Sequence, residues 1–243
     1  MEKSIYLKQI DNESKHWWFK ARREILNIQI KKYSTKKKMS ILDFGSGSGT
    51  NIHMLSKYGE VDVYEKDNKT SNFLKKKFNK NGIKIIKKCF SKKKYDLILA
   101  ADVIEHIKND KQIVKSLNKI LKKNGLIVVT VPAYQFLFSK KDKALKHFRR
   151  YNITNLKKLF SSNFKTLKLS YYNFFLFAPI ALAIIFFKLI NHQFINKTEK
   201  KPNSILNYIF YSLFKLEKFI LKYFNFPFGI SIISVFKKNK YLL

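Results

Sequence analysis

The chain has 243 residues, enough to bury the core of one α/β domain with an elaboration. Its one cysteine, Cys89, excludes an intramolecular disulfide framework and fits a reducing compartment. The formal net charge is +34, which would suit nucleic acid or an anionic membrane surface. Because the lysines are spread over the whole chain, we favour an evenly solvated surface over one designed patch.

Residues 1–38 are predicted to form a helical lid in front of the first strand. They contain both tryptophans, Trp17 and Trp18, then Arg22, and apolar positions at helical spacing as far as Tyr33. Aromatic rings could cover a flat base, and a guanidinium could hold a carboxylate. The alternative is a helix that only packs on the edge of the sheet. The first twelve residues are polar and lack the apolar centre of a secretory signal peptide.

A glycine-rich loop follows the first predicted strand, residues 39–44. Gly45, Gly47 and Gly49 have the spacing G-x-G-x-G, whereas a dinucleotide fingerprint has G-x-G-x-x-G. Glycines in such a turn let backbone N–H groups approach a ligand closely. Asp43 at the end of the strand would repel a pyrophosphate, but it would suit a ligand with a cationic amino group. The alternative is a glycine-rich turn without a ligand.

The second predicted strand begins at Val61 and ends in Glu65. In nucleoside-binding α/β folds an acidic residue at this point accepts hydrogen bonds from the ribose hydroxyls. A helix over residues 72–79 and a third strand over residues 83–86 are expected next. We therefore predict that Glu65 holds a ribose.

A buried strand over residues 97–101 is followed by the segment Asp102-Val-Ile-Glu-His-Ile107 and by an apolar helix face that continues to Leu121. Asn124-Gly125 is expected to stop this helix before a fifth strand over residues 126–131. The alternation of strands and helices predicts a parallel sheet covered by helices. Its ligand should lie beyond the carboxyl ends of the strands, where the glycine loop, Glu65 and Asp102 would meet.

Beyond the fifth strand, the string His147-Phe-Arg-Arg-Tyr151 is predicted to form a wall of the substrate side. The alternative is a surface loop that carries two more of the many basic residues. A helix over residues 156–160 and a sixth strand over residues 165–172 are expected to follow.

A hydrophobic insert then precedes the last strand, which is expected at residues 230–236. Residues 174–187 are fourteen apolar residues in a row, and residues 205–224 form an amphipathic pattern interrupted by lysines. If the last strand joins the sheet, the chain must return on one side, so a single membrane crossing is excluded. An interfacial hairpin that meets anionic headgroups is favoured. Two crossings or a buried cap over the substrate are the alternatives.

The glycine loop and the D-V-I-E-H-I segment together resemble class I S-adenosylmethionine-dependent methyltransferases, over nearly the full chain. The aromatic-Arg lead-in, the H-F-R-R-Y string and Pro227-Phe-Gly-Ile-Ser231 further resemble a bacterial methyltransferase-domain subgroup with quinone- and lipid-methyltransferase-like motifs. The fold implied is α/β, Rossmann-like, with a seven-stranded mostly parallel sheet, helices on both faces and a hydrophobic helical insert before the last strand. The expected parts are the lid (1–38), the cofactor-binding core (39–172), the hairpin insert (173–226), and the last strand with a basic tail (227–243).

The resemblance implies S-adenosyl-L-methionine as the cofactor, no metal, and a role for each motif. The residues implied in cofactor binding are Asp43, Gly45, Ser46, Gly47, Gly49, Glu65, Asp102 and Val103. Those implied in the substrate site and lid are Trp17, Trp18, Arg22, Arg149, Arg150 and Tyr151. His106 and His147 are candidates for a general base that deprotonates an acceptor hydroxyl. Relatives carry a carboxylate for the adenine after the third strand, and the stretch around Cys89 has none.

The predicted function is methyl transfer to a small-molecule, lipid or lipid-linked glycan acceptor, with residues 174–224 at the membrane surface. The enzyme is expected in the cytoplasm, associated peripherally with the inner face of the membrane. Alternatives are an RNA or protein methyltransferase that uses the basic surface, with nucleic acid possible but not favoured, and a non-catalytic membrane-associated module that binds the cofactor. A nicotinamide-dependent enzyme is disfavoured by the glycine spacing.

Overall fold

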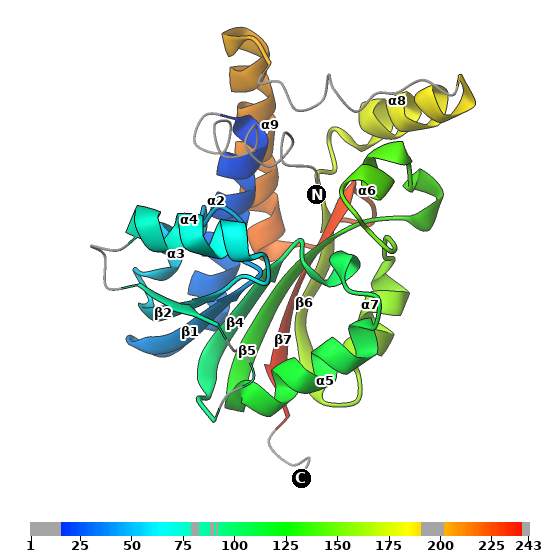
Figure 1. Ribbon diagram of the computed structural model, residues 1–243. Helices are drawn as coiled ribbons and strands as arrows, with labels where there is room; N and C mark the ends of the chain where they lie inside the picture. The colour runs from blue at the N-terminus through cyan, green and yellow to red at the C-terminus, as the bar shows by residue number, and fades with distance from the viewer. Residues whose placement is uncertain (1–15, 79–82, 88–89, 91, 191–201, 240–243) are drawn as a thin grey trace.

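A seven-stranded sheet of order β3-β2-β1-β4-β5-β7-β6 forms the centre of the computed structural model (Figure 1), which describes residues 16–78, 83–87, 90, 92–190 and 202–239. The first five strands are parallel, and β7 is antiparallel to both of its neighbours. This arrangement confirms the predicted seven-stranded, mostly parallel sheet. The strands are β1 (Met39–Phe44), β2 (Gly59–Tyr64), β3 (Lys84–Ile86), β4 (Tyr95–Ala101), β5 (Leu121–Pro132), β6 (Phe164–Tyr172) and β7 (Ser231–Lys238).

Helices cover both faces of this sheet. In Figure 1 α5 and α7 lie together in front of the strands, whereas α2 and α9 pair with each other on the other side. The helices are α2 (Trp17–Tyr33), α3 (Ile52–Leu55), α4 (Asn68–Phe78), η1 (Ile104–His106), α5 (Asp110–Ile120), η2 (Gln135–Leu137), α6 (Lys140–Ala144), α7 (Ile153–Phe160), α8 (Phe177–Leu189) and α9 (Ser204–Tyr223).

The parallel register brings the carboxyl ends of β1, β2 and β4 to one edge of the sheet. Asp43 lies beside Val63 on β2 and beside Leu99 on β4. The central strands are buried on both faces, as expected for parallel strands with helices on each side. The loops that leave these three strands therefore meet at one rim, and this rim carries the candidate site.

The predicted stop of the fifth helix at Asn124-Gly125 is wrong. Helix α5 ends at Ile120, and β5 begins at once with Leu121, which pairs with Tyr95 of β4. The register then shifts, so that Leu97 pairs with Leu126, and Asn124 in the irregular stretch has a φ of 61°. Strand pairing with β4 ends the helix earlier than the Asn-Gly signal would.

The two helices of the hydrophobic insert have different surroundings. Helix α9 packs along α2, where the ring centroids of Trp17 and Phe214 are 5.1 Å apart. Helix α8 instead projects away from the sheet beside α6 (Figure 1). Within the described ranges, no helix has both the length and the apolar character needed to cross a bilayer.

Candidate active site

The three glycines after β1 serve two structural purposes. At Gly45 an added Cβ would lie 2.7 Å from the side chain of Val103, and at Gly49 it would lie 2.7 Å from Phe78. These two glycines are needed for close packing. Gly47 has a φ of +58°, and a Cβ there would meet nothing within 4 Å. Gly47 therefore presents its bare backbone to open space at the rim, as a ligand-binding glycine would.

Glu65 follows β2 directly and holds the glycine loop in place. Its Oε2 atom accepts a hydrogen bond from the Gly47 N–H at 3.1 Å, and its Oε1 atom accepts one from the Asp67 N–H at 3.0 Å. The residue lines the large cavity at the rim. The predicted ribose-binding residue thus lies beside the glycine loop, as expected.

Asp43 does not reach the cavity, contrary to the expectation that it meets a cationic amino group. It is 1% exposed, and it accepts a hydrogen bond of 2.6 Å from the Ser46 hydroxyl. Burial raises the pKa of Asp43 to about 6, although the hydrogen bond from Ser46 opposes this rise. Because the carboxyl is sealed beneath the loop, Asp43 positions Ser46, and Ser46 lines the cavity in its place.

Asp102 follows β4 in a strained backbone conformation. Its φ is +55°, a region that residues with a Cβ rarely adopt, and such residues cluster at functional sites. The Thr130 hydroxyl donates a hydrogen bond of 2.9 Å to Asp102 Oδ1, and Arg22 forms an ion pair with Oδ2. Arg22 comes from α2, so the predicted lid helix reaches the rim through a charged contact. Asp102 and its neighbour Val103 both line the cavity.

The two tryptophans lie where α2 meets the cavity. Trp18 stacks on Tyr172 of β6, with ring centroids 5.8 Å apart and an interplanar angle of 6°. Trp17 is buried against Phe210 and Phe214 of α9. Both border the cavity, so the structure brings Trp17, Trp18 and Arg22 to one wall of it.

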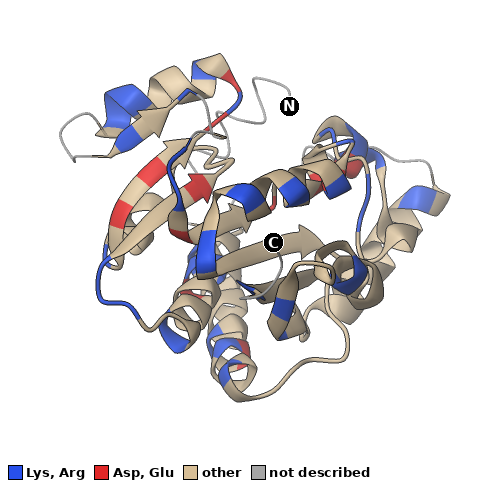
Figure 2. Cartoon of the chain, turned by 90° about the horizontal axis from the view of Figure 1, so that it is seen from below, with Lys and Arg blue, Asp and Glu red and all other residues tan. Residues whose placement is uncertain are grey.

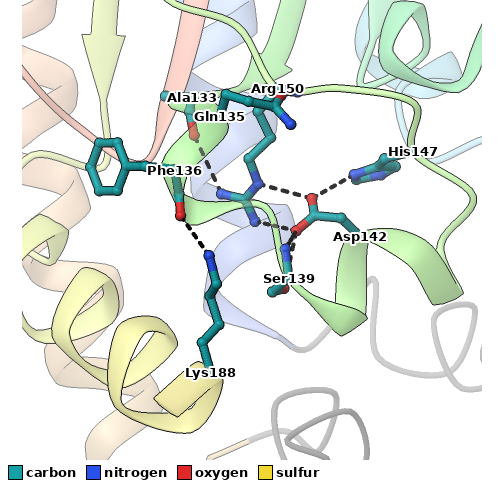
Figure 3. A network of polar contacts seen from close by, with 8 residues as sticks. All are labelled: Ala133, Gln135, Phe136, Ser139, Asp142, His147, Arg150 and Lys188. Atoms are coloured by element: carbon teal, nitrogen blue, oxygen red, sulfur yellow. Dashed lines mark hydrogen bonds and ion pairs between the residues drawn. The ribbon is translucent and has the colours of Figure 1, made fainter. Parts of the chain in front are cut away.

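The string at residues 147–151 divides between two environments. His147 and Arg150 line the cavity, and both contact Asp142 (Figure 3). Arg149 forms an ion pair with Asp110 at 2.7 Å, and the Tyr151 hydroxyl donates a hydrogen bond of 3.0 Å to the same carboxylate. Arg149 and Tyr151 therefore do not line the cavity, because both turn toward the Asp110 carboxylate at the start of α5.

Asp142 is the centre of a buried network that sequence reasoning missed. The capping box of α6 joins it to Ser139, and the guanidinium of Arg150 donates from Nε and Nη2 at 2.9 Å each. Burial alone would raise the pKa of Asp142, but hydrogen bonds from His147 and Arg150 hold it well below its ordinary value. The S-x-x-D spacing of Ser139 and Asp142 is the sequence signal that could have found it.

His106 lies against His147, with ring centroids 4.5 Å apart. His106 is exposed at the cavity, yet desolvation of its ring, followed by the neighbouring His147, lowers the pKa of His106 to about 4. Next to it, the Glu105 carboxyl is fully buried, and burial together with the charge of Asp102 raises its pKa well above the ordinary value. The two predicted general-base candidates therefore lie together at the cavity, beside a carboxyl that was not predicted.

An aromatic wall beside the glycine loop also escaped prediction. Phe44 and Tyr64, at the ends of β1 and β2, stack with ring centroids 5.4 Å apart, and Phe90 lies 6.4 Å from Phe44. All three line the cavity. The position around Cys89 where an adenine-binding carboxylate was sought lies outside the described residues. The aromatic residues that directly precede Gly45 and Glu65 are the signal that was overlooked.

The cavity that unites these groups has a volume of about 2090 Å³. Ligand pockets commonly measure about 300–1,000 Å³, so this space can take a nucleoside cofactor together with an acceptor. The residues present suit S-adenosylmethionine: a carboxylate at the end of β2, aromatic faces for a base, and an open glycine backbone. Glu65, Gly47 and Phe44 would hold its nucleoside part, and Ser46 and Asp102 would lie toward the amino-acid part.

Basic residues occur on helices and loops around the sheet in the view of Figure 2, rather than in one band. Several are already engaged: Lys36 and Lys122 pair with Asp96, and Lys93 pairs with Asp62. This distribution agrees with the evenly solvated surface favoured from the sequence.

Comparison with known proteins identifies the family. The model of a methyltransferase domain family matches residues 17–167. A ubiquinone biosynthesis O-methyltransferase from Rickettsia canadensis is 27% identical over 147 residues, which cover 51% of this chain and 61% of the relative. One from Pelagibacter ubique is 30% identical over 115 residues, covering 41% of this chain and 47% of the relative.

Solved structures show the same fold at low identity. The N-methyltransferase NodS from Bradyrhizobium japonicum, in complex with S-adenosylhomocysteine, is 9% identical, with a TM-score of 0.58 over 93% of this chain and 90% of that one. Coclaurine N-methyltransferase, bound to N-methylheliamine and S-adenosylhomocysteine, is 15% identical, with a TM-score of 0.56 over 88% of this chain and 70% of that one.

Proposed function

This chain belongs to the methyltransferase domain family, and we propose that it is a class I S-adenosylmethionine-dependent methyltransferase that methylates a small lipid or lipid-linked acceptor at a membrane surface. The observation that carries the proposal is the two-sided environment of α8. One face of this helix lines the cavity through Ile180, Ala183, Ile184 and Phe187. The other face is apolar and exposed.

The exposed face of α8 is mostly apolar. Leu182 is 66% exposed, Phe186 57% and Leu189 80%, and Lys188 is the single charged residue of the helix. A helix that is apolar all round is normally buried in a core or in lipid. With 13 residues α8 is about 20 Å long, too short for a hydrocarbon layer of ~30 Å. Insertion along the bilayer surface satisfies both facts.

Helix α9 supports this orientation with charge. Lys215 and Lys222 are exposed on it beside the exposed side chains of Leu216 and Phe219. Lysines beside apolar side chains suit the headgroups and acyl chains of an anionic bilayer. An acceptor dissolved in that bilayer would meet the cavity at the inner face of α8.

Chemistry at the site needs little more than alignment. The sulfonium of the cofactor supplies an activated methyl group, so the protein has to hold the acceptor in line with it and exclude water. Trp18 and Arg22 form the wall beside the cofactor rim. His106 and His147 also line the cavity, and we expect one of them to take the proton from an acceptor hydroxyl. The ubiquinone biosynthesis relatives are O-methyltransferases by name, which supports an oxygen acceptor.

The test combines membrane binding with methyl transfer. The double variant Leu182→Asp/Leu189→Asp should lose flotation with phosphatidylglycerol vesicles and transfer of labelled methyl groups to lipid extract, while it still binds the cofactor. Its control, Thr154→Asp/Asn155→Asp, adds the same charge at exposed positions of α7 and should behave as wild type. Equal flotation of all three proteins would refute the membrane proposal. Cofactor binding without transfer to any lipid or small-molecule extract would refute the acceptor class and favour a non-catalytic module.

A further inference from the structure

Three potential metal ligands from two distant segments meet at the cavity: Glu105, His106 and His147. One ligand atom from each lies within 4.8 Å of the others. Glu105 and His106 belong to the turn η1 after β4. The backbone N–H of Phe148 donates a hydrogen bond of 2.8 Å to the Glu105 carbonyl, and this bond brings the second segment to the first. The backbone therefore fixes the meeting point of the three side chains.

Glu105 is the least explained side chain of this group. It is 0% exposed, and neither of its carboxylate oxygens has a hydrogen-bond partner among the residues that the structure describes. Buried polar atoms are nearly always hydrogen-bonded, and an unpaired buried carboxylate is costly. A bound cation would supply the missing partner for both oxygens.

A carboxylate fixes the orientation of His147, as is usual for a histidine that binds a metal. His147 Nδ1 lies 2.9 Å from Asp142 Oδ1, and Asp142 is itself fixed by Ser139 and Arg150 (Figure 3). This contact leaves the Nε2 atom of His147 as its nitrogen for a ligand. A carboxylate that orients the far nitrogen of a histidine is the usual outer shell of a metal site. His106 lies edge-on to His147, at an interplanar angle of 80°.

We propose that Glu105, His106 and His147 bind one first-row divalent cation of the zinc type, with a coordination position open to the cavity. One carboxylate and two imidazoles are a ligand set that zinc and iron(II) sites use, whereas magnesium and calcium prefer oxygen ligands throughout. Tetrahedral zinc at about 2.0 Å from each ligand needs ligand atoms about 3.3 Å apart. The three side chains would close on the ion by roughly 1 Å through side-chain rotation.

The open coordination position could bind the oxygen of the methyl acceptor. This role of the cation rests on the proposed function. An acceptor hydroxyl bound there would release its proton to water more easily, because a cation lowers the pKa of an oxygen ligand. Its oxygen would then take the methyl group, and the sulfonium of the cofactor would leave as a neutral thioether. The two histidines would then act as ligands and not as bases. If the histidines bind a cation, a chelator should reduce methyl transfer. If they act as general bases, a chelator should leave methyl transfer unchanged.

Cation binding can be measured without acceptor or cofactor. The full-length protein, treated with chelator and desalted, is titrated with Zn²⁺ by calorimetry and with Co²⁺ by visible absorption. We expect one ion per chain and a tetrahedral Co²⁺ spectrum. The variants His147→Ala and Glu105→Gln should bind at least tenfold more weakly, and Asp142→Asn should weaken binding through the outer shell.

The matched control is His53→Ala, which removes an exposed histidine of α3 far from the cluster in the chain. It should bind the ion as wild type does. Circular dichroism and cofactor affinity, measured on every variant, separate loss of the site from loss of the fold. Absence of stoichiometric binding to the wild-type protein would overturn the cation site, as would equal binding by folded His147→Ala. Because neither titration uses an acceptor, such a result would leave the proposed methyl transfer standing.

Discussion

Two substitutions of Gly47 test the cofactor site. Both strain the backbone to a similar extent, but only one of them fills the space in front of the loop. Its φ of +58° strains any residue with a Cβ, by about 1–2 kcal/mol. Gly47→Ala and Gly47→Arg should therefore lower the free energy of unfolding by similar amounts. No atom lies within 4 Å of the added Cβ, so no packing clash adds to this strain.

Only the arginine would fill the space in front of the loop and place a positive charge beside the sulfonium. We expect Gly47→Arg to bind S-adenosylmethionine and S-adenosylhomocysteine at least a hundredfold more weakly than wild type, which corresponds to about 2.7 kcal/mol. Gly47→Ala should weaken binding far less. Calorimetric titration measures the affinities, and denaturant unfolding measures the stabilities. Wild-type affinity in Gly47→Arg would refute the placement of the cofactor against this loop.

Three further predictions concern carboxyl groups. Glu65→Gln leaves one oxygen acceptor for two backbone N–H groups, so we expect the cofactor affinity to fall about tenfold in calorimetry. Burial raises the pKa of Glu217 from 4.5 to about 7. Its stabilisation is therefore full below pH 4.5 and is lost as the pH rises to about 7, by up to roughly 3 kcal/mol. Urea unfolding at several pH values should show this loss in wild type but not in Glu217→Gln, and parallel pH profiles would contradict it. Asp142→Asn removes the negative charge that pairs with Arg150, whose side chain is 9% exposed, and should cost about 3–5 kcal/mol of unfolding free energy; a loss under 1 kcal/mol would contradict the network.

Local patterns were sufficient to predict the sheet and most of the rim. The alternation of apolar strands and helical segments predicted the parallel arrangement, and the last strand joined the sheet as expected. Gly47, Glu65 and Asp102 lie at the carboxyl ends of their strands because strand ends in a parallel sheet share one edge. These residues could be placed without knowing any side-chain contact.

Contacts between distant segments could not be predicted in this way. Either Asp43 or Ser46 could face the cavity, depending on how the loop folds back over the end of the strand. The sequence pattern is the same in both cases. Arg149 was expected at the substrate wall, but α5 presents Asp110 to it. The meeting of Glu105 with His147 depends on contacts between two segments that no periodicity connects, among them the hydrogen bond from the Phe148 N–H to the Glu105 carbonyl. Pairing across the fold decided each of these positions.

Side-chain contacts join the lid helix α2 to helix α9 of the hydrophobic insert. Glu24 of α2 accepts a hydrogen bond from Tyr211 and forms an ion pair of 2.6 Å with Lys218, both on α9. Two residues before Glu24, α2 places Arg22 on Asp102 at the cofactor rim. The insert therefore braces the helix that completes the cofactor pocket, and α8, which leaves the sheet just before α9, lies over the same cavity. A hydrophobic insert joined to the lid helix in this way borders the candidate site, so the lipid-facing surface that we propose for α8 would lie next to the proposed cofactor pocket.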